Sequence, residues 1–186
     1  MPSSAVSLSA PAGLLLLSLV STSAFACESD ESFLFTCQTE NASRSISLCG
    51  QQEDSGEGMR WLGLHYVYET ENGIEFSYPT DPAQGFKQFY FSHFFRNGLY
   101  EAYLRFAAGS DSYRIFFRDS PESANPDEVA APDAGVEISR GGKIAETIRC
   151  GERPSWYFDQ TRFLTACDME NPLGAKACEH DPPELK

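Results

Sequence analysis

The stretch QFYFSHFFRNGLYEAYLRF, residues 88–106, holds eight aromatic residues on the two sides of a short turn. Because successive side chains of a strand point to opposite faces, every second residue shares one face. Before the Asn97-Gly98 pair these residues are Phe89, Phe91, His93 and Phe95, and after it they are Tyr100, Ala102, Leu104 and Phe106. Arg96, Glu101 and Arg105 occur at a spacing that a membrane-spanning segment does not tolerate. We therefore expect a β-hairpin with one face in a hydrophobic core.

Runs of β-branched and aromatic residues continue from residue 31 onward, separated by Gly, Asn, Asp and Pro. Nine runs are predicted to be strands: residues 32–36, 45–49, 60–70, 74–78, 88–96, 99–107, 112–118, 136–139 and 143–150. Asn72-Gly73, Asn97-Gly98 and Gly141-Gly142 supply residues that tolerate the positive φ of two-residue hairpin turns. The pattern predicts an all-β fold, an antiparallel meander that forms a sandwich or barrel. Disulfides link it, and a short irregular or helical C-terminal segment follows.

The first residues have the pattern of an export signal. The apolar run from Gly13 to Val20 is too short to span a bilayer, and Ala24-Phe25-Ala26 provides a small-x-small cleavage pattern. We expect a signal peptide at residues 1–26, a single secreted β domain at residues 27–178 and a flexible tail at residues 179–186. The protein is accordingly predicted to be secreted or periplasmic, with no transmembrane segment in its mature chain.

All six cysteines follow the predicted cleavage point: Cys27, Cys37, Cys49, Cys150, Cys167 and Cys178. An even number of cysteines in an exported chain is typical of a disulfide framework. A zinc site formed by Cys167, Cys178 and His180 is the alternative, but the sequence has no C-x-x-C pair and the thiols would compete with oxidation. We therefore expect no metal site and no cofactor.

The alternation of strand side chains also predicts which cysteines pair. Cys37 continues an aromatic face of the first strand, whereas Cys49 lies on the face opposite to Leu48. A direct bond between the two cysteines would therefore need a bulge. Cys150 lies on the face of Ile148, which favours Cys37–Cys150 as a link between the first strand and the last. The remaining pairs are then Cys27–Cys49 and Cys167–Cys178.

The formal net charge of -13 lies entirely after residue 26. Nucleic acid is excluded as a partner, because its phosphates would be repelled and counterion release needs clustered Lys and Arg. Excess acid keeps a secreted protein soluble, and it also suits a cationic protein partner. The candidate binding residues lie in a Gly-rich loop and in an acidic Pro-rich loop at 119–133: Glu53, Asp54, Glu57, Asp119, Glu122, Asp127, Glu128 and Asp133. They form one negative patch if both loops leave the same end of the sheet, and two separately solvated loops otherwise.

Catalysis by a serine nucleophile needs a base within hydrogen-bond reach. Ser92 adjoins His93, but adjacent residues of a strand point to opposite faces. His65 and His93 are the plausible bases, and a packed structural histidine is the favoured interpretation of each. The sequence has no nucleophile elbow, no phosphate-cradling glycine loop and no His-Glu-x-x-His motif. We expect a protein without catalytic residues, with a hydrolase that uses His65 or His93 as the alternative.

Several short segments occur in a characteristic order: Cys27, Phe35-Thr36-Cys37, Ile46-Ser47-Leu48-Cys49, residues 102–106, Tyr113-Arg114-Ile115-Phe116, Gly135-Val136-Glu137-Ile138, Gly142-Lys143-Ile144 and Ile148-Arg149-Cys150. This order resembles a family of small exported proteobacterial β proteins that contain cysteines and have no assigned activity. The resemblance implies the fold and the export, and it transfers no catalytic residue. Cys167, Cys178 and the longer acidic loop depart from the family pattern.

The stretch AGSDSY, residues 108–113, keeps the glycine and the tyrosine of a Ser-Gly-x-x-Tyr loop but not the whole motif. In this respect the chain is similar to periplasmic lysozyme inhibitors of the c-type kind, which are small, disulfide-linked and all-β. The sequence thus predicts a secreted or periplasmic binding or envelope-associated module of unknown ligand, without enzymatic activity. An inhibitor of a basic enzyme such as lysozyme is the alternative, because the charges of the two proteins would be opposite.

Overall fold

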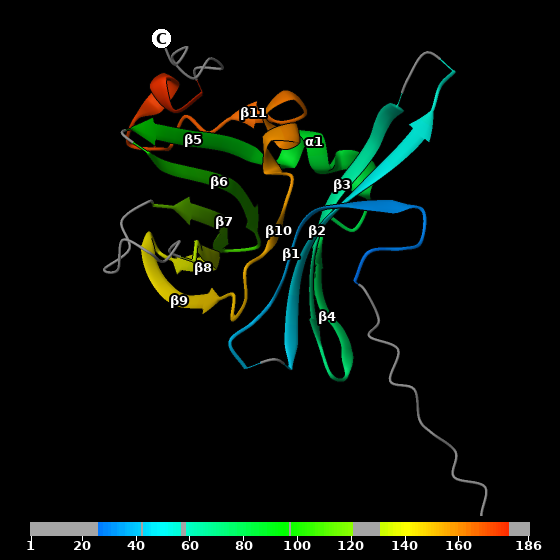
Figure 1. The fold of residues 1–186 in the computed structure, drawn as a ribbon, viewed down its shortest axis with the longest axis horizontal. Coiled ribbons are helices and arrows are strands. Elements are labelled where there is room, and N and C mark those ends of the chain that lie inside the picture. The colour runs from blue at the N-terminus through cyan, green and yellow to red at the C-terminus, as the bar shows by residue number, and fades with distance from the viewer. Residues whose placement is uncertain (1–25, 42, 57–58, 97, 121–130, 179–186) are drawn as a thin grey trace, which may run out of the picture.

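Two β-sheets pack against each other to form the fold (Figure 1). The computed structural model describes residues 26–41, 43–56, 59–96, 98–120 and 131–178. The strands are β1 (Glu31–Gln38), β2 (Arg44–Asp54), β3 (Met59–Thr70), β4 (Gly73–Tyr78), β5 (Tyr90–Arg96), β6 (Leu99–Ala108), β7 (Asp111–Asp119), β8 (Asp133–Arg140), β9 (Lys143–Arg149), β10 (Ser155–Trp156) and β11 (Ala166–Cys167). The helical turns are η1 (Pro82–Gln84), α1 (Gly85–Gln88), η2 (Phe158–Phe163) and η3 (Gly174–Cys178).

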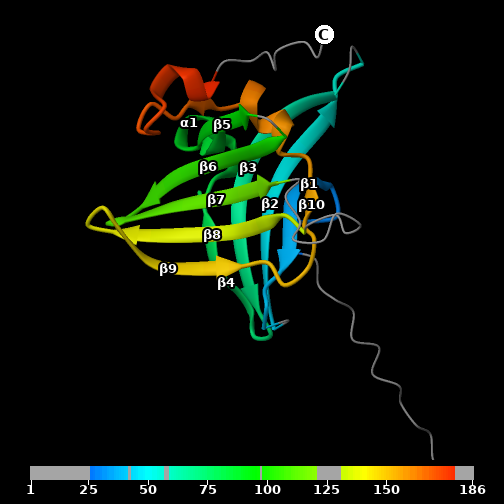
Figure 2. The same ribbon diagram turned by 60° about the vertical axis from the view of Figure 1, so that its left-hand side comes forward.

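The first sheet has the strand order β10-β1-β2-β3-β4, and the second has the order β11-β5-β6-β7-β8-β9. Strands that follow one another in the chain pair antiparallel within each sheet, whereas β11 runs parallel to β5. In Figure 2, the strands of the second sheet run across those of the first. All nine predicted strands are present, and of the two predicted all-β forms, sandwich and barrel, the two separate sheets form a sandwich.

Glycines with positive φ stand at the three predicted hairpin turns: Gly73 at 105°, Gly98 at 85°, Gly141 at 57° and Gly142 at 77°. A side chain would strain the backbone at these angles, which explains the glycines. Gly141-Gly142 and residues 97–98 are the two-residue loops of their hairpins. In the β3–β4 hairpin, Gly73 pairs with Thr70, so the loop lies one residue earlier than predicted. Asn97 lies outside the described residues.

One hydrophobic cluster fills the space between the sheets. At its centre, Phe106 is fully buried and stacks against Tyr78 and Tyr113, with ring centroids 4.8 and 4.9 Å apart. The predicted core face of β6 is buried at Ala102, Leu104 and Phe106. In β5, Phe91 is buried but Phe95 is 41% exposed. Phe95 lies one residue before the end of β5, and in Figure 1 the hairpin end of β5 and β6 extends to the left, beyond the first sheet.

A helical segment precedes β5, where the sequence pattern predicts that the strand begins at Gln88. Its start is set by Asp81, whose Oδ1 accepts a hydrogen bond from the backbone N–H of Ala83 at 3.1 Å, and by Pro82 in the first turn. Gly85 then packs so closely that a Cβ would lie 1.9 Å from the carbonyl oxygen of Leu64. The Asp-Pro pair is thus a helix-start signal that strand alternation does not reveal.

The three disulfides join the predicted pairs, Cys27–Cys49, Cys37–Cys150 and Cys167–Cys178. Cys37 in β1 bonds to the residue after β9, so this bond ties the first sheet to the second. Cys49 points away from the main core into a small cluster with Cys27 and Val67. The three predicted pairs are thus confirmed. The zinc alternative is wrong, because the sulfur atoms of Cys167 and Cys178 are bonded to each other.

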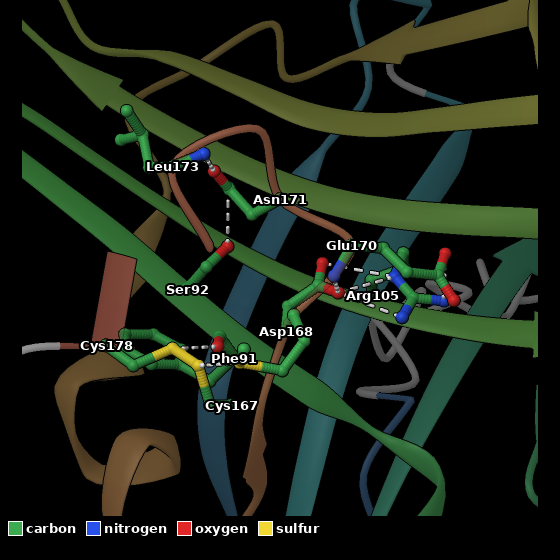
Figure 3. Close-up of a disulfide and its surroundings, with 10 residues drawn as sticks. Phe91, Ser92, Arg105, Cys167, Asp168, Glu170, Asn171, Leu173 and Cys178 are labelled. Atoms are coloured by element: carbon green, nitrogen blue, oxygen red, sulfur yellow. Dashed lines mark hydrogen bonds and ion pairs between the residues drawn. A yellow bond between two sulfur atoms is a disulfide. The ribbon is translucent and has the colours of Figure 1, made fainter. Parts of the chain in front are cut away.

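Residues 166–178 form a C-terminal clip against the outer face of β5 (Figure 3). The backbone N–H of Asp168 donates to the carbonyl oxygen of Phe91 at 2.8 Å, and Asn171 Nδ2 donates to Ser92 Oγ at 3.0 Å. Arg105 of β6 donates from Nε and Nη2 to Asp168 Oδ1 at 3.0 and 2.9 Å. The clip explains why Ser92, on the outer face of the sheet, is completely buried.

Within the described ranges, no helix is both long enough and apolar enough to cross a bilayer. The predicted signal peptide up to residue 25, residues 121–130 of the acidic loop and the predicted tail at residues 179–186 lie outside the described part of the chain.

Candidate functional site

A cleft with a volume of about 240 Å³ lies between the two sheets. Strands β2, β3 and β4 line one side of it, and β7, β8 and β9 line the other. β4 and β9 are the last strands of their sheets, and both lie in the lower half of Figure 1. We call this hollow the inter-sheet cleft, and define it by its aromatic lining of Tyr66, Tyr68, Phe76 and Tyr113 and its charged lining of Arg44, Glu75 and Glu146.

Aromatic rings from both sheets form the floor of the inter-sheet cleft. Tyr113 stacks nearly parallel to Phe76 on one side and to Phe106 on the other, with centroid distances of 5.1 and 4.9 Å. Tyr66 packs at a tilt against Phe76 and Phe106, at 5.9 and 5.2 Å. Such ring pairs add stability beyond the area that they bury, so the floor is a rigid surface. Phe76 and Tyr113 are only half-buried and reach the mouth of the cleft.

The hydroxyl of Tyr66 has no hydrogen-bond partner among the described residues, although the residue is only 2% exposed. Burial raises the pKa of Tyr66 far above its ordinary 10.0, and Tyr68, Tyr113 and Glu146 raise it further. These three neighbours all line the inter-sheet cleft, which places the hydroxyl on the cleft side. The phenol is therefore a neutral donor and acceptor that faces the cleft with its hydrogen-bonding capacity unused.

Three charged side chains stand at the rim of the inter-sheet cleft, Arg44 on β2, Glu75 on β4 and Glu146 on β9. In the described part of the chain, none of them forms an ion pair. The guanidinium of Arg44 lies over the ring of Tyr68, 5.9 Å from its centroid. Glu75 and Glu146 are exposed and belong to opposite sheets, so two carboxylates and one guanidinium stand around the opening.

A second hollow of about 130 Å³ adjoins the first, and the two share Arg44, Glu146 and Ile148. Thr39 lines this second hollow and is 5% exposed, and its Oγ1 has no hydrogen-bond partner. Glu40 also lines it. Buried polar atoms are normally hydrogen-bonded, so Thr39 Oγ1 is an exception, and it lies along the same groove as Tyr66.

Neither histidine considered as a catalytic base lines the inter-sheet cleft. His65 Nε2 lies 3.2 Å from Glu31 Oε2, but the side chains are only 13% and 6% exposed and the contact lacks hydrogen-bond alignment. Glu31 also accepts a hydrogen bond from the backbone N–H of Glu28 at 2.9 Å. Cys27 and Cys49 lie beside Glu31, but their sulfurs are bonded to each other and offer no thiolate to a metal. His93 is half-buried beside the ring of Phe91.

The described members of the acidic candidate set lie on two different sheets. Glu53 and Asp54 end β2, where Glu53 pairs with Arg60 at 2.7 Å and Asp54 Oδ1 accepts the backbone N–H of Gly56 at 2.9 Å. Asp119 ends β7 and Asp133 begins β8, and Asp133 pairs with Arg118 and Arg149. In Figure 1 the β2–β3 hairpin extends to the upper right, whereas β7 ends on the left. Glu57, Glu122, Asp127 and Glu128 lie outside the described residues.

The outer face of β7 and β8 carries a buried ion network around Glu137. Glu137 is 6% exposed and accepts hydrogen bonds from Arg114 at 2.9 Å and from Arg118 at 3.0 Å. Burial favours the neutral carboxyl, but the two guanidinium hydrogen bonds outweigh it and lower the pKa of Glu137. Because its charges are mutually satisfied, this network serves the stability of the sheet.

Comparison with protein-family models, with curated proteins and with solved structures gave no match to the chain.

The residues of the inter-sheet cleft are absent from the candidates that the sequence suggests. The signal for them is the spacing of Tyr66 and Tyr68, which places two phenols on one face of a single predicted strand. An inward-facing tyrosine needs a hydrogen-bond partner, so such a pair points to a polar site within a core. The sequence does not show that Tyr113 lies opposite, because β7 belongs to the other sheet.

Proposed function

We propose that the protein is an exported, non-enzymatic binding module and that the inter-sheet cleft is its ligand site. The observation that carries the proposal is the concave cleft between the two sheets, whose aromatic lining includes Tyr66, a residue that is only 2% exposed and makes no side-chain hydrogen bond in the described part of the chain. Ligand sites are typically mostly apolar hollows with a few polar groups that orient the ligand. The cleft combines an aromatic floor with Tyr66 and three rim charges, which fits that description.

The absence of catalysis in this proposal rests on the surroundings of the histidines. A general base must reach a substrate proton, directly or through one water molecule. His65 and its contact Glu31 are enclosed in the structure, and His93 packs against an aromatic ring. Export is supported by the three disulfides, which persist in oxidising compartments, and by the cleavage pattern that ends at Ala26. The mass of the protein isolated from an expressing host tests it, since cleavage after Ala26 gives a chain that begins at Cys27.

Mapping ligands by NMR tests the binding function. A fragment library that includes cations, anions and neutral compounds is expected to contain compounds that shift the amide signals of Tyr68 and Tyr113. Ile148→Trp places a large side chain in the cleft, and Ile144→Trp makes the same change at a residue of β9 that is 57% exposed and outside the cleft. We expect binding to be lost in the first variant and kept in the second, with both variants folded by circular dichroism. A library without a single cleft-directed compound would contradict the proposal.

Inhibition of a basic enzyme such as lysozyme is the second candidate function. The net charge of -13 favours it, because opposite charges speed the encounter of two proteins. Hen-type lysozyme is a suitable basic probe. If this function holds, the protein reduces lysozyme activity, and its binding weakens as salt is raised, because exposed charges are screened over roughly 10 Å at 0.1 M ionic strength. Binding that is absent at low salt, or unchanged between low and moderate salt, would reject it.

A further inference from the structure

We infer that the inter-sheet cleft selects a small organic cation, an ammonium group carried on an aromatic or apolar body. The inference rests on the proposed binding function and names the chemical class of the ligand. The floor of the cleft favours a ligand with an apolar body, because the floor consists of aromatic rings and of the side chains of Ile138 and Ile148. A body of about the size of one benzene ring suits a hollow of about 240 Å³.

The rim sets the charge of the ligand. Glu75 and Glu146 face the cleft from opposite sheets, and Glu40 lines the adjoining hollow. All three carboxylates are without an ion pair in the described part of the chain, whereas the second basic residue of the groove, Arg149, is engaged by Asp133. Arg44 is therefore the one basic side chain of the groove, as far as its described lining goes, that no carboxylate neutralises. Three carboxylates that lack an ion pair, set against one such guanidinium, leave a negative potential where a ligand enters.

Besides the rim carboxylates, the floor of the cleft offers a cation hydroxyl oxygens and the faces of aromatic rings. The oxygen of Tyr66 can accept an ammonium N–H, because it makes no hydrogen bond in the described part of the chain and its residue lines the cleft. The position of Arg44 over Tyr68 shows that a cation already occupies the face of this ring. A cationic ligand thus competes with Arg44, and an anionic ligand would need it. Substitution of Arg44 therefore has opposite effects on the two classes of ligand.

Three probes that share a phenyl ring test the charge selection: phenethylamine as the cation, phenethyl alcohol as the neutral analogue and phenylacetate as the anion. NMR titration of the intact protein at low salt gives their dissociation constants from the cleft signals. We expect phenethylamine to bind more tightly than phenethyl alcohol, and phenylacetate to bind most weakly. Raising the salt concentration should weaken the cation selectively.

Matched variants assign the effect to the rim. Glu146→Gln should weaken phenethylamine about two- to fivefold, since one exposed ion pair is worth a fraction of a kcal/mol up to about 1 kcal/mol. Arg44→Gln should strengthen it by a similar factor. Glu152→Gln removes the same charge from an exposed residue outside the cleft and should leave the affinity unchanged.

The outcomes separate the ligand class from the binding function. If phenylacetate or phenethyl alcohol binds in the cleft as tightly as phenethylamine, or if Arg44→Gln weakens the cation, the inference is overturned while the binding function stands. If no probe and no library compound shifts the cleft signals, both fail. If Glu152→Gln weakens phenethylamine as much as Glu146→Gln does, the overall charge and not the cleft is responsible, and the inference is again overturned.

Discussion

Loss of the Cys37–Cys150 disulfide is predicted to destabilise the protein more than loss of the disulfide in the C-terminal clip. The two cysteines are 113 residues apart in the sequence, and their bond ties the first sheet to the second. A disulfide restricts the unfolded chain more as the closed loop grows. For this separation the chain-entropy relation gives about 5 kcal/mol, whereas the separation of 11 residues between Cys167 and Cys178 gives about 3 kcal/mol.

The assay is urea unfolding of two double variants, Cys37→Ala/Cys150→Ala and Cys167→Ala/Cys178→Ala, followed by tryptophan fluorescence. Each variant removes two sulfur atoms and one bond, so they differ mainly in the length of the released loop and in its place in the fold. We expect the first variant to lose about 2 kcal/mol more free energy of unfolding than the second. An equal loss in both variants, or a larger loss in the clip variant, would refute the loop-length argument. It would show that local packing around the clip outweighs the tie between the sheets.

Three further predictions concern single side chains. Asp168→Ala leaves the largely buried guanidinium of Arg105 without its main partner, so urea unfolding should show a free energy of unfolding lower by about 3 kcal/mol. The control is Glu170→Ala, which removes a carboxylate that is 76% exposed. A loss for Asp168→Ala that is no larger than the loss for this control would contradict the prediction. The ion network lowers the pKa of Glu137 below its ordinary 4.5, so the network stabilises the protein above that pH and the stabilisation is lost as pH falls through the lower, folded-state pKa. The free energy of unfolding of Glu137→Gln should therefore fall less on acidification than that of the wild type. Equal slopes of this free energy against pH would reject the role of the network. The pKa of Tyr66 is raised, so above its ordinary 10.0 the phenol ionises in the unfolded chain but not in the folded one, and the stability of the fold decreases. Tyr66→Phe should reduce this loss of stability at alkaline pH, measured by thermal melts at increasing pH. An unchanged loss would mean that the phenol is not enclosed.

The sequence by itself determines nine of the strands, their hairpin turns to within one residue and the disulfide pairs. These features depend on side-chain alternation with a period of two and on residues that permit positive φ, and both are local properties of the chain. The side chain of Cys49 points away from the main core because of its position relative to Leu48 in the same strand. Such parity can be read without knowing where the other sheet lies. It fails only where the register shifts, as at the bulge between Phe33 and Phe35, which places Phe33 in the outer cluster and Phe35 in the core.

The tertiary structure alone decides the inter-sheet cleft and the C-terminal clip. Tyr66 and Tyr113 approach each other because two sheets, formed by separate parts of the chain, pack face to face, and no local pattern encodes that relative placement. The parallel pairing of β11 with β5 likewise depends on an edge strand that the rest of the second sheet leaves available. The rim charges show the same limit, since Glu75 and Glu146 are ordinary exposed residues of their own strands. They become parts of one site only because the packing of aromatic rings, which favours a few mutual orientations, brings the edges of the two sheets together.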